Sequence, residues 1–345
     1  MKKGISLIVL VITIIVIIIL AGAVVLSLSK NNPISSATEA TFKANLSEYN
    51  NELTMFISSE YVKNTGKLNL SNINATNLTG TYDSGKTIKE IITSMTTADS
   101  NKFQIEVGKL IYTGSNDNEK SWASNMGVST GYVKTGLLLR QDFVSKTNSD
   151  IDRDIVQDLS GNANTGSLVN FEYDNLSGYA NNGLNFDSTN DMIIFSNIID
   201  LQSIWSIEIS SKFYNLSKTF QFFLGTRNID TEGKILLNYN GYIAFRTPNN
   251  IYTNFSVLSS EINNVDSILT FVSNGTTIKL YVNSVLRSTI TPSSTYCRMD
   301  CLGNAWSDLV WLSKLKLYNI KVYNREITDA EIIQNYVFEK SRSIL

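Results

Sequence analysis

Histidine is absent from the 345 residues of this chain, and this absence excludes several kinds of catalytic and metal site. Without an imidazole there is no Ser-His-Asp or Cys-His site, no histidine general base and no histidine-ligated zinc or iron. Charge is also scarce, because charged residues make up 17% of the chain and the net charge is −2. The chain therefore lacks the basic footprint that binding to nucleic acid requires.

Cysteine is nearly absent as well, with only Cys297 and Cys301 in "YCRMDCLGN". Two thiols cannot supply the four ligands of a structural metal site. A disulfide needs Cα atoms roughly 4.4 to 6.8 Å apart, whereas residues four apart in a strand are separated by roughly 13 Å. We expect a bridge formed around a tight turn at residues 298–300, as an oxidising compartment would allow. The alternative is two free thiols.

A pair of acids suited to glycoside hydrolysis is missing too. Such hydrolysis needs two carboxyl groups about 5 to 9.5 Å apart. The strand-like stretch "SIWSIEISSKFY" carries Glu208 with no acidic partner two or four residues away. We therefore expect that the protein is not an enzyme.

What the chain does contain is an uncharged apolar run from Ile5 to Leu28, preceded by Lys2 and Lys3. As a helix this run would be roughly 36 Å long, which exceeds the roughly 30 Å hydrocarbon layer of a bilayer. The sequence thus predicts a transmembrane helix over residues 5–29, with its basic N-terminus in the cytoplasm. A cleaved secretory signal is the alternative, although its apolar run is normally shorter.

The stretch "KKGIS", followed by the apolar run, resembles the class III leader and helix of type IV pilins and pseudopilins. This resemblance implies a leader peptide of residues 1–4, which a prepilin peptidase would cut between Gly4 and Ile5, with methylation of the new N-terminus. It also implies assembly with other pilin subunits, although Val9 stands where pilins usually carry a glutamate. A plain signal anchor is the alternative.

Residues 30–135 are predicted to form a pilin-like amphipathic helix and a small α+β head. "KFQIEVGKLIYTG" alternates as a hairpin through Val107 and Gly108 would, and "NDNEKSWASNMGV" is typical of a short helix ending near Gly127. The helix is indicated by apolar side chains at helical spacing, namely Phe42, Leu46, Tyr49, Leu53, Phe56 and Ile57.

From Gly136 onward, strand-like segments alternate with turns every roughly 8 to 12 residues, a pattern typical of an all-β sandwich. Asn-Gly pairs at 240–241 and 274–275, with Asn-Ser at 283–284, predict hairpins. Four segments, "IVQDLSGNANTGSLVNF", "GLNFDSTNDMIIF", "TFVSNGTTIKLYVNSVLRSTI" and "LKLYNIKVYNREITDAEIIQNY", resemble in this order the LamG-like (concanavalin A-like) jelly roll. The resemblance implies an antiparallel jelly-roll sandwich over residues 136–345 that binds a glycan, a glycoprotein or another polymer.

The sandwich is predicted to close with a short C-terminal helix. Thr328 and Glu331 stand three residues apart, as in a capping box at a helix N-terminus. The buried side of this helix is predicted from its apolar residues, which are Ile332, Ile333, Tyr336 and Val337.

Members of the jelly-roll family often hold calcium at the rim of the sandwich through oxygen ligands, which calcium prefers. The turns "QDLSGNAN" and "FDSTND" supply the candidate ligands Asp158, Asn162, Asp187, Asn190 and Asp191. Asp187 and Asp191 are the best candidates, because two carboxylates on one short turn repel each other unless a cation joins them. The alternative is that Asp and Asn stand here because tight turns favour them.

A sugar-binding site needs aromatic rings beside polar amides. Tyr239, Tyr242, Tyr252, Trp306 and Trp311 lie on or beside the ends of predicted strands. Of these, Tyr239, Tyr242 and Trp306 are the candidate ligand contacts. The alternative is that all five are core or edge residues, since aromatic side chains fit pleated surfaces.

These features predict a non-enzymatic, pilus-associated adhesin at the cell membrane and cell surface, whose jelly roll binds a glycan or a surface protein. One alternative is a structural minor subunit that primes assembly of a type IV pilus or a type II secretion pseudopilus, with the sandwich as an inert cap. Another is a plain membrane-anchored binding module.

Overall fold

The computed structural model describes residues 33–66, 68, 70–144, 146–216, 220–227, 232–303 and 312–342. The chain divides into two compact units, Met1–Val128 (unit 1) and Ser129–Leu345 (unit 2), whereas the sequence predicts a boundary between residues 135 and 136. The predicted leader and its cleavage point between Gly4 and Ile5 lie outside the described residues.

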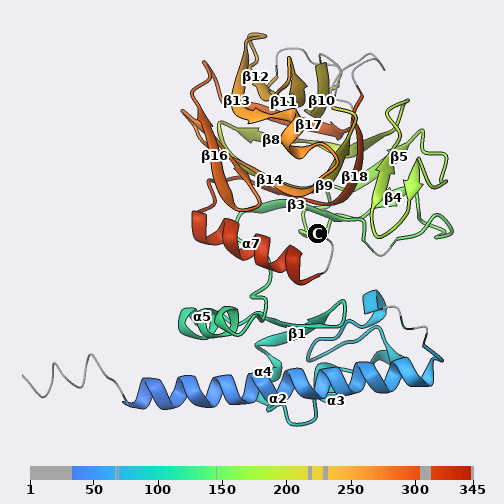
Figure 1. The fold of residues 1–345 in the computed structure, drawn as a ribbon, viewed down its shortest axis with the longest axis vertical. Helices are drawn as coiled ribbons and strands as arrows, with labels where there is room; N and C mark the ends of the chain where they lie inside the picture. Colours follow the sequence, from blue (N-terminus) through green and yellow to red (C-terminus); the bar gives the residue numbers. More distant parts are fainter. Residues whose placement is uncertain are drawn as a thin grey trace, which may run out of the picture. The chain divides into compact units, whose positions relative to one another are not determined.

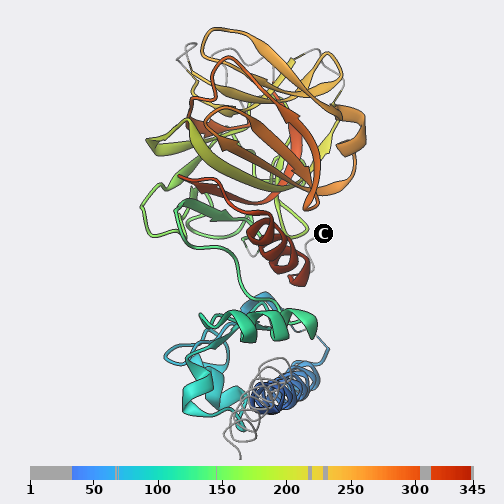
Figure 2. The ribbon, with the colours of Figure 1, turned by 90° about the vertical axis from the view of Figure 1, so that its left-hand side faces the viewer.

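Unit 1 is organised around one long helix, α2 (Pro33–Lys63). Of the six residues of the predicted apolar stripe, three are buried in one core and the other three are partly buried and pack against it, which confirms the amphipathic helix. The hairpin of β1 (Phe103–Glu106) and β2 (Lys109–Tyr112) packs on this core and turns through Val107 and Gly108, both at positive φ, as predicted. Figure 2 looks along α2 and shows the rest of unit 1 to one side of it. The other elements are η1 (Leu70–Asn72), η2 (Asp83–Gly85), α3 (Ile88–Ile91), α4 (Thr97–Ser100) and α5 (Asp117–Asn125).

The fold predicted from the sequence, with a transmembrane helix at its start, is corrected by the structure. In the described part of the chain, no helix is long and apolar enough to cross a bilayer. The physical reason is that α2, the helix that follows the apolar run, carries charged residues throughout, including Glu39, Lys43 and Glu52. Residues 5–29, where the membrane helix was predicted, lie outside the described residues. The fold that the structure supports is a predominantly β sandwich with few helices.

Unit 2 is a sandwich of two antiparallel sheets (Figure 1). Sheet 1 consists, in hydrogen-bonding order, of β13 (Tyr252–Leu258), β12 (Tyr242–Arg246), β11 (Lys234–Tyr239), β10 (Phe220–Gly225), β17 (Cys297–Leu302), β8 (Met192–Gln202), β5 (Gly166–Val169) and β4 (Ile155–Val156). Sheet 2 consists of β16 (Val285–Ile290), β15 (Ile278–Val282), β14 (Asp266–Asn274), β9 (Ile204–Tyr214), β18 (Lys314–Tyr323), β7 (Leu184–Phe186) and β6 (Gly178–Tyr179), with β3 (Leu137–Asp142) paired to β18. A short helix, α6 (Ser259–Ile262), links β13 to β14.

The predicted hairpins and sandwich core are confirmed. The pairs 240–241, 274–275 and 283–284 lie at the turns between β11 and β12, β14 and β15, and β15 and β16. Between the sheets lies one large apolar cluster, in which each fully buried large side chain contributes about 1.5–3 kcal/mol. Its largest member, Trp205, is fully buried and donates its indole N–H to the carbonyl of Thr295 at 2.8 Å.

The C-terminal helix, α7 (Asp329–Ser341), begins at the predicted N-cap, Thr328, with the predicted capping box to Glu331. In both views it lies against the sheet that contains β3 (Figures 1 and 2). Its predicted buried side is partly wrong, because Ile333 is 52% exposed. The reason is that the sheet beneath it presents charged side chains, so the helix buries a largely polar face made of Ile332, Asn335, Phe338, Glu339 and Arg342.

Candidate functional site

Three carboxylates meet at one corner of unit 2. Asp187 follows β7, Asp191 precedes β8, and Glu172 lies on the loop that follows β5. One carboxylate oxygen from each lies within 4.8 Å of the others. The register of the sheet brings Glu172 here, because Val169 at the end of β5 is paired with Met192 at the start of β8.

Asp191 is the buried member of this group, whereas Glu172 is exposed. One carboxylate oxygen of Asp191 accepts the hydroxyl of Ser177 at 2.9 Å, and the other accepts the backbone N–H of Asp187 at 2.8 Å. Burial raises the pKa of Asp191 to about 7, and the nearby charges of Asp187 and Glu172 act in the same direction. A hard divalent cation with oxygen ligands, such as calcium, would relieve the repulsion within this cluster.

Of the other predicted calcium ligands, Asp158 and Asn162 serve a different purpose. The carboxylate of Asp158 accepts backbone N–H groups from Arg140, Ser160 and Asn164 at 2.9–3.1 Å. The amide of Asn162 donates to the carbonyl of Leu137 at 2.9 Å. These two side chains therefore fasten their turn to β3, and Asp158 does not belong to the carboxylate cluster.

Asn190, the remaining predicted ligand, stands directly before Asp191. Its side-chain Oδ1 is buried and has no hydrogen-bond donor among the described residues. An amide oxygen without a donor is a group that a cation could satisfy, and amide oxygens are common calcium ligands.

A second candidate site is a group of half-buried rings on the face of sheet 1 that points away from the core, here called the aromatic patch: Phe220, Tyr239 and Tyr252. The rings of Tyr239 and Tyr252 are stacked, with centroids 4.3 Å apart and planes 13° apart. Phe220 leans on both, at 5.2 Å from Tyr239 and 5.8 Å from Tyr252. The patch rests on a buried layer of Phe222, Leu236, Ala244 and Cys301.

Polar groups border the aromatic patch. Arg246 on β12 is the cross-strand neighbour of Tyr252, and it donates from Nε to the side-chain oxygen of Asn250 at 2.8 Å. Tyr242, a predicted contact, is 38% exposed and is the cross-strand neighbour of Tyr239 at the β11–β12 hairpin. Trp306, the third predicted contact, lies outside the described residues. The structure thus places Tyr242 beside Tyr239 and groups Tyr239 with Tyr252, both named from the sequence, and with Phe220, which was not named from the sequence.

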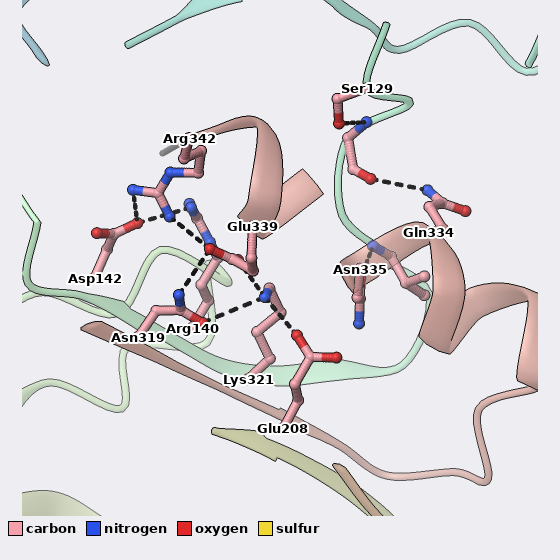
Figure 3. A network of polar contacts seen from close by, with 12 residues as sticks. Ser129, Arg140, Asp142, Glu208, Asn319, Lys321, Gln334, Asn335, Glu339 and Arg342 are labelled. Carbon is pink, nitrogen blue, oxygen red and sulfur yellow. Dashed lines mark hydrogen bonds and ion pairs between the residues drawn. The ribbon is translucent and has the colours of Figure 1, made fainter. Parts of the chain in front are cut away.

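Glu208 belongs to a buried ionic network under α7 (Figure 3). Lys321 lies 2.7 Å from Glu208 and 2.5 Å from Glu339, and all three side chains are fully buried. Burial raises the pKa of Glu208, and Lys321 opposes this rise. Glu339 on α7 gives Glu208 the acidic neighbour that its own strand lacks. Both carboxylates are fully buried, so a substrate cannot reach them and they do not form a catalytic pair.

This network continues along α7. Arg342 lies 2.6 Å from Asp142 and 3.2 Å from Glu339, and Arg140 lies 2.9 Å from Asp142. Burial alone would raise the pKa of Asp142, but Arg342 and Arg140 outweigh it and lower the pKa. Three cations are thus matched by three carboxylates beneath the helix, and the cluster fixes α7 to sheet 2.

The two cysteines are free thiols, which corrects the expected disulfide. Both lie on β17, and a strand is too extended to bring residues four apart within bonding distance. The side chains also diverge, because Cys297 packs in the core between the sheets and Cys301 under the aromatic patch.

No family model matches this chain, and no curated protein does. Among solved structures, the receptor binding domain of a botulinum neurotoxin C/D mosaic serotype has a TM-score of 0.44 and 15% identity, and the match covers 60% of this chain and 52% of that one. Domain 4 of AbnA, a GH43 extracellular arabinanase from Geobacillus stearothermophilus solved with arabinotriose, has a TM-score of 0.41 and 15% identity, covering 58% and 98%. The sialidase of Trypanosoma rangeli in complex with the inhibitor DANA has a TM-score of 0.42 and 12% identity, covering 62% and 34%.

Proposed function

We propose that unit 2 is a glycan-binding module and that a sugar ring stacks on the aromatic patch. The observation that carries this proposal is the stacked pair of half-buried rings, Tyr239 and Tyr252, on a sheet face that points away from the core. Sugars bind to such rings through their C–H faces, while neighbouring amides and hydroxyls select the orientation of the ring. Asn250 and the hydroxyl groups of the tyrosines are the polar groups at hand.

A role in binding rather than catalysis is supported by the state of Glu208. This carboxylate is the acid on the strand-like stretch in which the sequence shows no catalytic pair, and it is buried under α7 with Lys321 as its partner. Glycoside hydrolysis requires two carboxyl groups that reach the substrate from either side of the scissile bond. Glu208 and Glu339 instead serve to attach the helix.

We also propose that the corner formed by Glu172, Asp187 and Asp191 holds a calcium ion. Two observations support this: three carboxylate oxygens lie within 4.8 Å of one another, and the neighbouring Asn190 has a buried oxygen without a donor. A bound calcium would hold the β5–β6 loop against the β7–β8 turn. Its role is therefore to stabilise the rim of the sandwich.

The glycan proposal is tested by screening the full chain on a glycan array and then measuring the affinity for the strongest hit by calorimetry. Tyr239→Ala and Tyr252→Ala each remove one ring of the stacked pair. We expect each to weaken binding about tenfold, since a ring contact contributes about 1 kcal/mol or more. Tyr61→Ala, which removes an exposed tyrosine from α2 in unit 1, is the matched control and should bind as the unaltered chain does.

Two results would overturn the glycan proposal. One is the absence of any hit on the array, which would favour the sandwich as an inert cap. The other is an unchanged affinity in both tyrosine variants with the fold intact.

Placement at the cell surface remains a prediction from the sequence, and the structure and comparisons give no support for a pilin leader, pilin partners or membrane anchoring.

A further inference from the structure

A pocket of about 330 Å³ lies in unit 2 on the outer face of sheet 2, near the end of the sheet that is formed by β7 and β6. Its floor is formed by Lys314 and Lys316 on β18 and by Tyr214 on β9. Leu315, between the two lysines, points the other way into the core. Because side chains alternate along a strand, both lysines face the pocket side, roughly 6.6 Å apart along the chain.

The positive charge of the lysines at this pocket is not fully neutralised by acidic side chains among the described residues. Lys316 is the direct cross-strand neighbour of Lys212, and like charges in opposite positions destabilise a sheet. Asp266 compensates Lys212, with 3.5 Å between its Oδ2 and the lysine Nζ, and also accepts the hydroxyl of Tyr318. Neither Lys314 nor Lys316 has an ion pair or hydrogen bond within the described ranges.

The position of Lys316 is set by the backbone that packs on its stem. At Gly183, a Cβ would lie 2.8 Å from Cγ of Lys316 and 3.0 Å from Cδ1 of Tyr318. The turn that carries Gly183 is closed by a hydrogen bond of 2.9 Å, in which the backbone N–H of Ala180 donates to the carbonyl of Gly183. Burial lowers the pKa of Lys316, Asp266 opposes this, and Lys212 adds to it. Lys316 is therefore a half-buried ammonium in a shaped site, rather than a freely moving surface lysine.

Amide groups also line the pocket, and one of them, Asn185 on β7, is the direct cross-strand neighbour of Lys316. Asn175, Asn181 and Asn185 all line it, and the side chain of Asn185 donates to the carbonyl of Asn175 at 2.8 Å. Leu176, which is 64% exposed, supplies an apolar edge. Ammonium groups bind anionic oxygens, amides bind hydroxyls, and a small apolar surface suits the C–H face of a ring.

We propose that this pocket binds an acidic sugar, with a carboxylate or sulfate between Lys314 and Lys316 and the ring hydroxyls on the asparagine amides. A volume of about 330 Å³ is at the small end of ligand pockets and suits one small ligand. The pocket is on sheet 2 and the aromatic patch is on sheet 1. This proposal therefore stands without the glycan site proposed above.

The test is a calorimetric titration of the full chain with three probes: glucuronate, glucose 6-sulfate and uncharged glucose. We expect at least one acidic sugar to bind, and which of the two binds identifies the acidic group. Lys314→Met and Lys316→Met keep the apolar stem and remove the charge, so each should weaken that binding about tenfold. Lys279→Met, on the same sheet but paired with Glu326, is the matched control and should change nothing.

Gly183→Ala separates a shaped site from a general effect of charge. It leaves the net charge unaltered but displaces the stem of Lys316, so it should also weaken binding of the acidic sugar, with folding checked by thermal denaturation. Tighter binding of glucose than of both acidic sugars would overturn the proposal. So would unaltered binding in both lysine variants, or normal binding in a folded Gly183→Ala variant.

Discussion

The Nζ atom of Lys321 lies 2.5 Å from Oε1 of Glu339, and neither side chain is exposed to solvent. This contact joins a strand of sheet 2 to the last helix, and the same lysine also reaches Glu208 at 2.7 Å (Figure 3). Removing one partner of a buried ion pair leaves an uncompensated charge, which costs far more than the loss of a surface pair. The stability of unit 2 therefore depends on a contact between charges as well as on its apolar core.

Lys321→Met should lower the free energy of unfolding by about 3–5 kcal/mol, because the buried Glu208 would lose its cation and Glu339 would keep only Arg342. Urea denaturation followed by circular dichroism measures this loss. Lys279→Met is the control, since its pair with Glu326 is about one-third exposed and should cost less than about 1 kcal/mol. Equal losses in the two variants would contradict a structural role for the buried network.

Calcium at millimolar concentration should raise the melting temperature of the full chain, because a ligand that binds only the folded state stabilises that state by mass action. At a ligand concentration of one hundred times Kd, this stabilisation is about 2.7 kcal/mol. Asp187→Asn and Glu172→Gln should each reduce this rise, while Asp158→Asn should retain it, since Asp158 lies outside the cluster. Differential scanning calorimetry with and without a chelator makes the measurement. No calcium-dependent change in the unaltered chain would leave these residues as ordinary turn formers.

Acid should weaken the start of α7 through Glu331. Two hydrogen bonds from the guanidinium of Arg325 lower the pKa of Glu331 below its ordinary 4.5, against the effect of burial. A group with a lowered folded-state pKa stabilises the fold above its unfolded pKa, and this contribution is lost as the pH falls through the folded pKa. Glu331→Gln keeps the capping box and removes the charge, so its difference in stability from the unaltered chain should shrink below about pH 4.5.

Urea unfolding curves collected from neutral pH to about pH 3 give that difference. Arg325→Met is the companion variant, because it removes the cation that lowers the pKa of Glu331. It should reduce the acid sensitivity in the same way. A difference between Glu331→Gln and the unaltered chain that stays constant over this range would rule out the pairing as its source.

The two thiols should be inert in the folded protein. Burial raises the pKa of Cys297 to about 12 and that of Cys301 well above its ordinary value. Since the thiolate is the reactive form, alkylation by iodoacetamide should be negligible until denaturant is added, after which both cysteines react. Mass spectrometry of the two samples makes the comparison. A disulfide, seen as a mass two hydrogens lower and lost on reduction, would contradict the free thiols of β17.

The sequence predicted well those features that depend on local pattern. The apolar spacing from Phe42 to Ile57 identified the buried side of α2, and Asn-Gly pairs identified hairpins, because both signals come from neighbouring residues. The N-terminus of α7 was found for the same reason, since a capping box is local. The pairing of strands into sheets is not local, and it determines which side of α7 is buried and which carboxylates lie together.

Two failures show this. The buried side of α7 could not be inferred from apolar residues, because Glu339 and Arg342 are also buried there. Both form ion pairs with charged side chains on strands that are distant in the sequence. Glu172 was missed for a similar reason: only the pairing of β5 with β8 places it beside Asp191. The sequence signal available in each case was a charged residue without an apparent partner, which is too common to single out a site.

The polar contacts of α7 also determine how unit 2 would respond to a pulling force. The backbone N–H of Val133, near the start of the unit, donates to the side chain of Asn335 at 2.8 Å, and Asp142 on the first strand holds Arg342 at the far end of the helix. The two ends of the unit are thus tied directly to each other. Tension applied through them would load these few bonds first and leave the two sheets unstrained until the bonds break. Joining the ends by a short linker and opening the chain at the Asn240-Gly241 turn should, for the same reason, give a folded circular permutant.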